Sequence, residues 1–140
     1  MIYLIGSLRN TEIPIIANRL REAGHDVFED WYSAGPNADD HWRDYERGRG
    51  RSYQEALDGL AACHVFDFDY AHLEAASIAI LVLPAGRSCG MEFGWMCSRG
   101  KRGYILLDDP SRWDVMFRFA HKSGGKVFSD IDSLIKELAQ

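Results

Sequence analysis

The chain has 140 residues, a net charge of −5 and a pI near 5.5, and 46% of its residues are hydrophobic. These values favour one packed domain and exclude a wholly disordered chain. The acidic balance argues against nucleic acid as a partner, because affinity for phosphate backbones comes from clustered cations. No apolar run approaches the ~20 residues that cross a bilayer, and the start "MIYLIGSLRN" does not resemble a signal peptide, so we expect no membrane partner.

The cysteines carry information about compartment and metal binding. Cys63, Cys89 and Cys97 are odd in number, show no CxxC spacing and have no clustered histidine partner. We therefore expect no disulfide framework, no metal site and no other cofactor. Reduced cysteines are typical of a cytoplasmic protein.

The first elements alternate between short apolar runs and an amphipathic stretch. Residues 2–5 predict a strand that ends at Gly6 and Ser7. Residues 11–25 predict a helix with Thr11 as a candidate N-cap, Pro14 in the first turn and Gly24 as its stop. Residues 26–29 predict a second strand.

The second half repeats this alternation. Residues 77–84 form the most continuous apolar run and predict a strand buried on both faces. A helix from about Gly90 to Gly100, a strand over 103–107, a helix over roughly 111–121 and a strand over 126–128 follow. A last helix over 130–139 has Asp130 as its cap and an apolar face, made of Ile131, Leu134, Ile135 and Leu138.

Residues 30–77 are too long for one crossover and predict a mobile loop, a long helix over about 40–61 and a short helix over 69–76. The early part of this segment contains Trp31, Tyr32, Trp42 and Tyr45 among many charges. Two interpretations stay open: these aromatic side chains belong to a lid that stacks on a planar ligand, or they pack the segment onto the sheet. Trp31 is the strongest candidate for ligand contact.

Strand and helix alternation predicts an α/β fold in one domain, residues 1–140: a three-layer sandwich around a parallel sheet of about five strands. The sheet is expected to be flavodoxin-like or Rossmann-like, with an insertion or lid at about 30–60 between the second and third strands. Ligands of such sheets lie beyond the carboxyl ends of the strands. The candidate loops are therefore "GSLRN" and "PAGRSCG".

Glu92 is the main catalytic candidate, because it follows the buried strand and is expected in the first turn of the next helix. That helix N-terminus would keep its carboxylate ionised. An alternative is that glutamate is simply favoured at helix starts. Tyr3 is either an orienting donor or a half-buried strand residue, and Asp67 and Asp69 are either functional or helix N-caps. No GxGxxG, Walker A or HExxH motif is present.

Three blocks of the chain, 50 of its 140 residues, carry a family resemblance: "YLIGSLRN", "DFDYAHLEAASIAILVLPAGRSCGMEFGWMCSRGK" and "DVMFRFA". They resemble the nucleoside 2-deoxyribosyltransferase superfamily, which includes the deoxynucleoside 5′-monophosphate N-glycosidases. Residues 30–60 lie outside this resemblance. It implies that Glu92 is the nucleophile that attacks C1′ of the sugar, that Tyr3 orients this carboxylate, and that Asp69 assists departure of the base.

The resemblance also implies binding residues. Two loops are expected to contact the base, the sugar and any phosphate: Gly6, Ser7, Leu8 and Arg9 in the first, and Gly86, Arg87 and Ser88 in the second. Asp114 and Met116 match positions that complete the neighbouring subunit's site, which implies a homo-oligomer, a dimer or larger.

Two positions depart from the family pattern. Gly86 and Asp114 stand where the monophosphate hydrolases carry serines, and the acidic residue that the transferases usually have at position 86 is also missing. The expected function is cleavage of the N-glycosidic bond of a nucleoside or nucleotide, with transfer to another base or to water. The alternatives are an NAD-type glycohydrolase and a non-catalytic nucleotide sensor.

Overall fold

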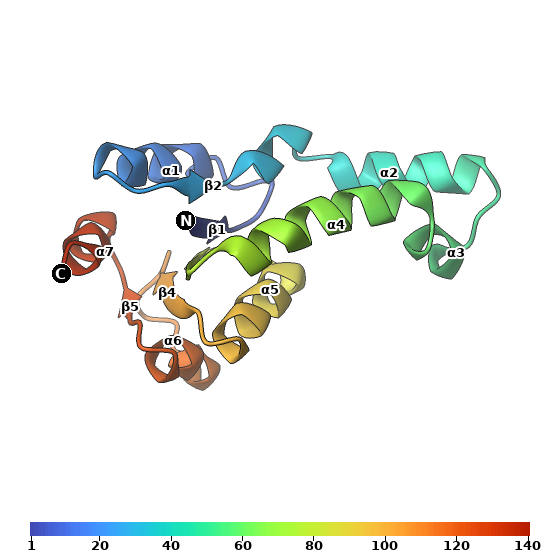
Figure 1. The fold of residues 1–140 in the computed structure, drawn as a ribbon. Helices are drawn as coiled ribbons and strands as arrows, with labels where there is room; N and C mark the ends of the chain where they lie inside the picture. The colour runs from blue at the N-terminus through green and yellow to red at the C-terminus, as the bar shows by residue number, and fades with distance from the viewer.

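A five-stranded, all-parallel sheet forms the centre of the molecule in the computed structural model, which describes residues 1–140 (Figure 1). The strand order is β2-β1-β3-β4-β5, which is the flavodoxin-like order and confirms the predicted fold class. The strands are β1 (Ile2–Ile5), β2 (Val27–Phe28), β3 (Ile78–Val82), β4 (Arg102–Leu106) and β5 (Val127–Phe128).

Seven α-helices and two short 3₁₀ helices connect these strands. The helices are α1 (Ile13–Glu22), α2 (Ala38–Gly48), α3 (Tyr53–Leu57), α4 (Leu60–Ala75), α5 (Arg87–Ser98), α6 (Arg118–Lys122) and α7 (Ile131–Leu138). The 3₁₀ helices are η1 (Asp30–Ala34) and η2 (Val115–Phe117). No helix is both long enough and apolar enough to cross a bilayer.

The core has two halves, one on each face of the sheet. Successive strand residues point to opposite faces, so Leu4 lies in one half and Tyr3 in the other. The helices α1 and α7 cover the first face, while α5, α6 and the C-terminal end of α4 cover the second (Figure 1). This arrangement is the predicted three-layer sandwich.

Helix ends agree with the sequence where a local signal is strong. Asp130 caps α7, since its Oδ1 accepts a hydrogen bond from the Ser133 amide at 2.8 Å. Pro14 lies in the first turn of α1, and Gly24 follows that helix with a φ of 95°, as predicted. Thr11 is not the N-cap of α1, because the helix begins only at Ile13.

The segment between β2 and β3 differs most from prediction. The expected helix over 40–61 is divided into α2, α3 and the start of α4, and the expected helix over 69–76 is the C-terminal part of α4. Gly50 breaks the first helix with a φ of 75°. Ser52 and Glu55 then form a capping box that starts α3, and Gly59 is the N-cap of α4.

Two other helix starts were predicted wrongly. The helix expected from Gly90 begins at Arg87, because Gly86 is its extended N-cap and Gly90 lies inside it. The helix expected from 111 begins four residues later as η2. Asp109 and Asp114 accept backbone hydrogen bonds from residues two positions ahead, and such turns compete with helix formation.

The Tyr104 hydroxyl is buried without a hydrogen-bond partner, and the side chain is 0% exposed. Desolvating an unpaired hydroxyl is unfavourable, so Tyr104→Phe should raise the free energy of unfolding by about 1 kcal/mol. Urea unfolding followed by circular dichroism measures this. A loss of stability instead would contradict the prediction and would reveal a buried partner, such as a water molecule.

Candidate active site

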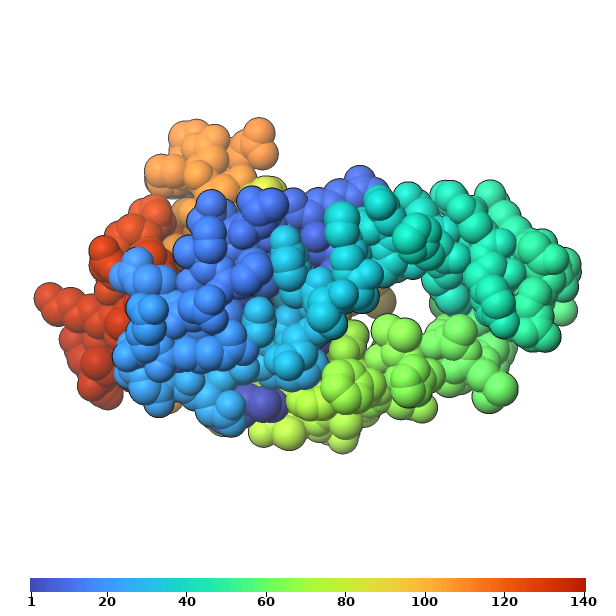
Figure 2. All heavy atoms as spheres, turned by 90° about the horizontal axis from the view of Figure 1, so that it is seen from above, coloured from blue at the N-terminus to red at the C-terminus, as the bar shows by residue number.

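A cavity of about 630 Å³ lies at the carboxyl ends of β1 and β3. Its volume is in the usual range for small-molecule sites, and its position is the edge where parallel sheets bind ligands. The loop after β1, η1, the start of α2, the middle of α4 and the start of α5 surround it. Figure 2 shows the hollow between the α2–α3 segment and α4.

Glu92 lies in this cavity, but its environment is not the one predicted. Because α5 begins at Arg87, Glu92 is in the second turn rather than the first. The favourable effect of a helix N-terminus falls off within one turn. Burial, together with the nearby charge of Asp69, raises the pKa of Glu92 to about 7. The expectation that the helix start keeps Glu92 ionised is therefore wrong.

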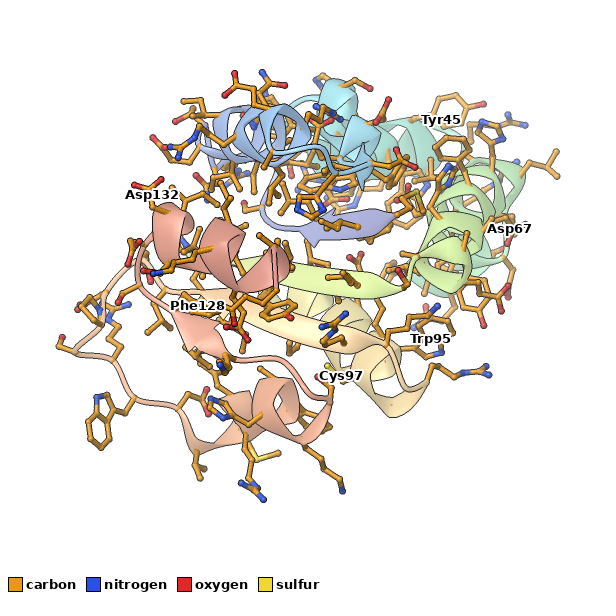
Figure 3. All side chains as sticks on the ribbon, turned by 60° about the vertical axis from the view of Figure 1, so that its left-hand side comes forward. Tyr45, Asp67, Trp95, Cys97, Phe128 and Asp132 are labelled. Atoms are coloured by element: carbon orange, nitrogen blue, oxygen red, sulfur yellow. The ribbon has the colours of Figure 1, made fainter.

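Asp69 also lines the cavity, from the middle of α4. The prediction that Asp67 and Asp69 precede a helix, where they would act as N-caps, is wrong because α4 begins at Leu60. Burial raises the pKa of Asp69, and His72 partly opposes this shift. Asp67 is exposed and does not line the cavity, and Figure 3 shows it on the outside of α4.

Tyr3 forms the floor of the cavity and is only 1% exposed. Its ring packs against Phe28 with 5.2 Å between ring centroids. Burial, followed by the nearby charges of Glu92 and Asp69, raises the pKa of Tyr3. The hydroxyl therefore stays protonated and can donate a hydrogen bond to a neighbouring carboxylate.

The first loop forms one wall of the cavity through the four residues predicted there: Gly6, Ser7, Leu8 and Arg9. Gly6 is required for close packing, because a Cβ at this position would lie 2.3 Å from Ile13 Cδ1. Ser7 Oγ accepts a hydrogen bond from the Arg9 amide at 3.1 Å, which shapes the turn. Arg9 Nη2 lies 4.0 Å from an Asp40 carboxylate oxygen across the cavity mouth.

The second loop leads into α5, and Gly86, Arg87 and Ser88 line the cavity as predicted. Gly86 provides no side-chain cap, so the first amides of α5 remain available. Such amides next to an arginine and a serine can bind an anionic group. The cavity also contains four carboxyl groups, which outnumber its two arginines: Asp39, Asp40, Asp69 and Glu92.

Trp31 both packs onto the sheet and lines the cavity, so each of the two interpretations given above applies to it in part. Its Nε1 donates a hydrogen bond to the Leu4 carbonyl at 2.9 Å, and its ring packs against both halves of the core. It also lines the cavity, so it is a fixed wall rather than a side chain on a free loop. Tyr32, Trp42 and Tyr45 do not line the cavity.

Asp114 and Met116 lie outside this cavity: Asp114 lines hollows of about 290 and 670 Å³, and Met116 lines one of about 270 Å³. Asp114 Oδ1 accepts a hydrogen bond from the Met116 amide at 2.9 Å, which fixes the turn before η2. Their expected role in a neighbouring subunit's site stays a prediction.

The sequence reasoning missed several lining residues, notably Cys89 on α5, Val65 on α4, and Asp39 with Asp40 on α2. Cys89 could have been found, because it precedes Glu92 by three residues and so shares its helix face. Burial raises the pKa of the Cys89 thiol. No three His, Cys, Asp or Glu side chains are grouped so that they could hold a metal ion.

The chain matches no protein-family model, and no curated protein sequence matches it significantly. The resemblance to the nucleoside 2-deoxyribosyltransferase superfamily therefore stays a prediction.

Proposed function

We propose that the protein cleaves the N-glycosidic bond of a nucleoside or nucleotide, with Glu92 as the nucleophile. The observation that carries this proposal is that two partly buried carboxyl groups, Glu92 and Asp69, line one cavity with Tyr3 at the ligand edge of the sheet. Three residues assigned together by the motif resemblance are thus close in space, although they are far apart in the sequence.

The reaction has two steps. A carboxylate oxygen of Glu92 forms a bond to C1′ while the bond from C1′ to the base nitrogen breaks, and the electron pair leaves with the base. Asp69 supplies the proton that neutralises the departing base. Water or a second base then forms a bond to C1′ and gives its proton to the Asp69 carboxylate, while the bond between C1′ and Glu92 breaks and its electron pair returns to the Glu92 carboxylate. The negative charge of Glu92 near C1′ also stabilises the oxocarbenium-like transition state, which is positively charged.

The raised pKa values of Glu92 and Asp69 allow the two carboxyl groups to share one proton. Two interacting carboxyl groups titrate as a pair, and one proton can remain on the pair near neutral pH. In the reacting form, Glu92 is the carboxylate and Asp69 holds the proton. The neutral Tyr3 hydroxyl can fix the orientation of the Glu92 carboxylate.

Incubation with separate nucleosides, nucleotides and NAD, followed by chromatographic detection of free base, tests the proposal. Base release from a nucleoside or nucleotide that is lost in Glu92→Gln supports it. Release from NAD alone would favour the glycohydrolase alternative. Thermal stabilisation by a nucleotide without any base release would favour a sensor and contradict the proposal.

The rate of base release should depend on the ionisation of Glu92. Since Glu92 must be deprotonated while Asp69 keeps its proton, kcat/KM should pass through a maximum and fall about tenfold per pH unit above the pKa of about 7, where the pair has lost both protons. In Asp69→Asn this falling limb should disappear, because no acid remains there to lose its proton. A falling limb that persists in Asp69→Asn would contradict Asp69 as the proton donor.

The proposed function is accompanied by a proposed oligomeric state and a proposed cellular compartment. We propose a homo-oligomer in which Asp114 and Met116 approach a neighbouring subunit's cavity. The side chain of Met116 is 61% exposed and makes no contribution to the cavity of its own chain, which supports this assignment. The three free cysteines support a reducing compartment such as the cytoplasm.

A further inference from the structure

His72 lies in the last turn of α4, three residues after Asp69, and its ring is held by several contacts. The ring stacks on Phe28 of β2, with 3.9 Å between the ring centroids and 14° between the ring planes. The ring of Phe68 lies 4.6 Å from it on α4. The Phe68 carbonyl oxygen can only accept, so His72 Nδ1 carries a hydrogen and donates it to this oxygen at 2.7 Å. The position and the orientation of the imidazole are therefore fixed.

The same contacts connect His72 to the floor of the candidate site. Phe28 stacks on His72 and also packs against Tyr3, with 5.2 Å between the last two ring centroids. Three rings in a row thus join α4 to β1. His72 itself does not line the cavity, so it is not placed to touch a substrate. Any effect of His72 on a reaction there must act through its neighbours.

Asp69 is the neighbour that His72 influences most directly. Side chains three residues apart on a helix lie on the same side of it. The charge of Asp69 and that of Glu92 on α5 disfavour each other, and burial raises the pKa of Asp69. His72 acts in the opposite direction, because its positive charge lowers the pKa of Asp69. It therefore favours the carboxylate form that burial and Glu92 disfavour.

We propose that His72 is a positioning residue for Asp69: it fixes the turn of α4 that carries this carboxyl group and supports the negative charge that the group gains during the reaction. The Asp69 O–H bond breaks as the base nitrogen takes the proton, and the electron pair of that bond stays on the Asp69 carboxylate. A donor that holds its proton too tightly is a poor acid catalyst, so a positive charge beside Asp69 speeds this step. The inference rests on the proposed function, which makes Asp69 the proton donor.

A packing role alone would not need a histidine. Phenylalanine has a ring of similar size that can stack on Phe28, but it has neither the Nδ1 donor nor a charge. His72→Phe therefore keeps the ring stack and removes the two features that the inference uses. His64→Phe is the matched control, because it is the same substitution on the same helix, at an exposed position outside the cavity.

Base release from two nucleosides tests the inference. One has a neutral base, and the other has a base that is cationic because a ring nitrogen is methylated, so that this base leaves without a proton. His72→Phe should lower kcat/KM by about tenfold for the neutral base, less than Asp69→Asn does, because the proton donor itself remains. It should leave kcat/KM for the cationic base nearly unchanged. His64→Phe should match the unmodified protein with both nucleosides.

A second variant keeps the test valid if the first does not fold. His72→Asn has a side-chain donor for the Phe68 carbonyl but no charge, so it should show the same selective loss with the neutral base. The thermal midpoint of each variant, measured by circular dichroism, shows whether it is folded at the assay temperature.

Three results would overturn the inference. Equal losses of His72→Phe with the two nucleosides would mean that His72 only packs, and an unchanged rate with the neutral base would mean that His72 has no part in the reaction. Both results leave the proposed function intact, provided that Glu92→Gln is inactive. No base release by the unmodified protein from any nucleoside or nucleotide would overturn the proposed function and the inference with it.

Discussion

Glu92→Gln should lower the rate of base release by about a thousand-fold or more, because the substitution removes the attacking group of a covalent mechanism. Glutamine keeps the size and hydrogen-bonding capacity of glutamate but has neither the negative charge nor the nucleophilic oxygen. Glu92→Ala should be similarly inactive. Chromatographic measurement of free base at saturating substrate gives the rates.

The same variant should keep its fold and gain stability at high pH. Burial raises the pKa of Glu92 from 4.5 to about 7, so the folded state binds the proton more tightly than the unfolded state. The stability associated with this group is complete below pH 4.5 and is lost as pH rises through about 7. A glutamine side chain cannot ionise, so the thermal midpoint of Glu92→Gln should exceed that of the unmodified protein above this range.

A covalent intermediate offers a direct check. Fluorine at C2′ of a nucleoside withdraws electrons and so destabilises the positive charge that develops at C1′. Release of the sugar from Glu92 should therefore be slow, and a sugar adduct should accumulate on this residue. Intact-protein mass spectrometry would detect this adduct, and Glu92→Gln should not form it. Near-normal base release by Glu92→Gln would show that the proposed mechanism is wrong, even though the fold is the one expected.

The order of elements and the ligand edge were predictable from sequence because strong local signals define them. The run over 77–84 is apolar throughout, as a strand covered on both faces must be, and β3 occupies its centre. Asp130 and Pro14 mark helix starts by simple hydrogen-bonding rules. The loops after β1 and β3 then meet at one edge as a consequence of parallel strand order.

The electrostatic state of the site was not predictable in the same way. Helix position alone favours an ionised Glu92, but burial depends on how α4, α5 and the first loop close over it. Desolvation is a tertiary effect, and here it is larger than the local helix effect. The start of α5 at Arg87 instead of Gly90 made the error worse, since it moved Glu92 away from the helix end.

The sequence also did not predict that α2 lines the cavity. Asp39 and Asp40 lie in a segment with no motif, and their approach to the cavity follows from the direction in which η1 leads the chain. The packing role of Trp31 sets that direction, through its hydrogen bond to Leu4 on β1. Contacts of this kind depend on loop geometry, which residue periodicity does not encode.

Asp69→Asn should lower base release by about a hundred-fold or more, because protonation of the departing base typically accelerates such reactions by that factor. Asparagine is close to aspartate in size but cannot deliver the proton. Asp67→Asn is the matched control: it is the same substitution two residues earlier on α4, at an exposed position outside the cavity. This control should keep nearly full activity.

The leaving group distinguishes a proton donor from a residue that only shapes the cavity. A nucleoside whose base is already cationic, such as one methylated on a ring nitrogen, needs no proton in order to leave. Asp69→Asn should therefore lose much less activity with this substrate than with the unmethylated one, whereas Glu92→Gln should lose activity with both. Equal losses of Asp69→Asn on the two substrates would assign Asp69 to positioning, and equal losses of Asp67→Asn and Asp69→Asn would remove it from the reaction, because only Asp69 faces the cavity.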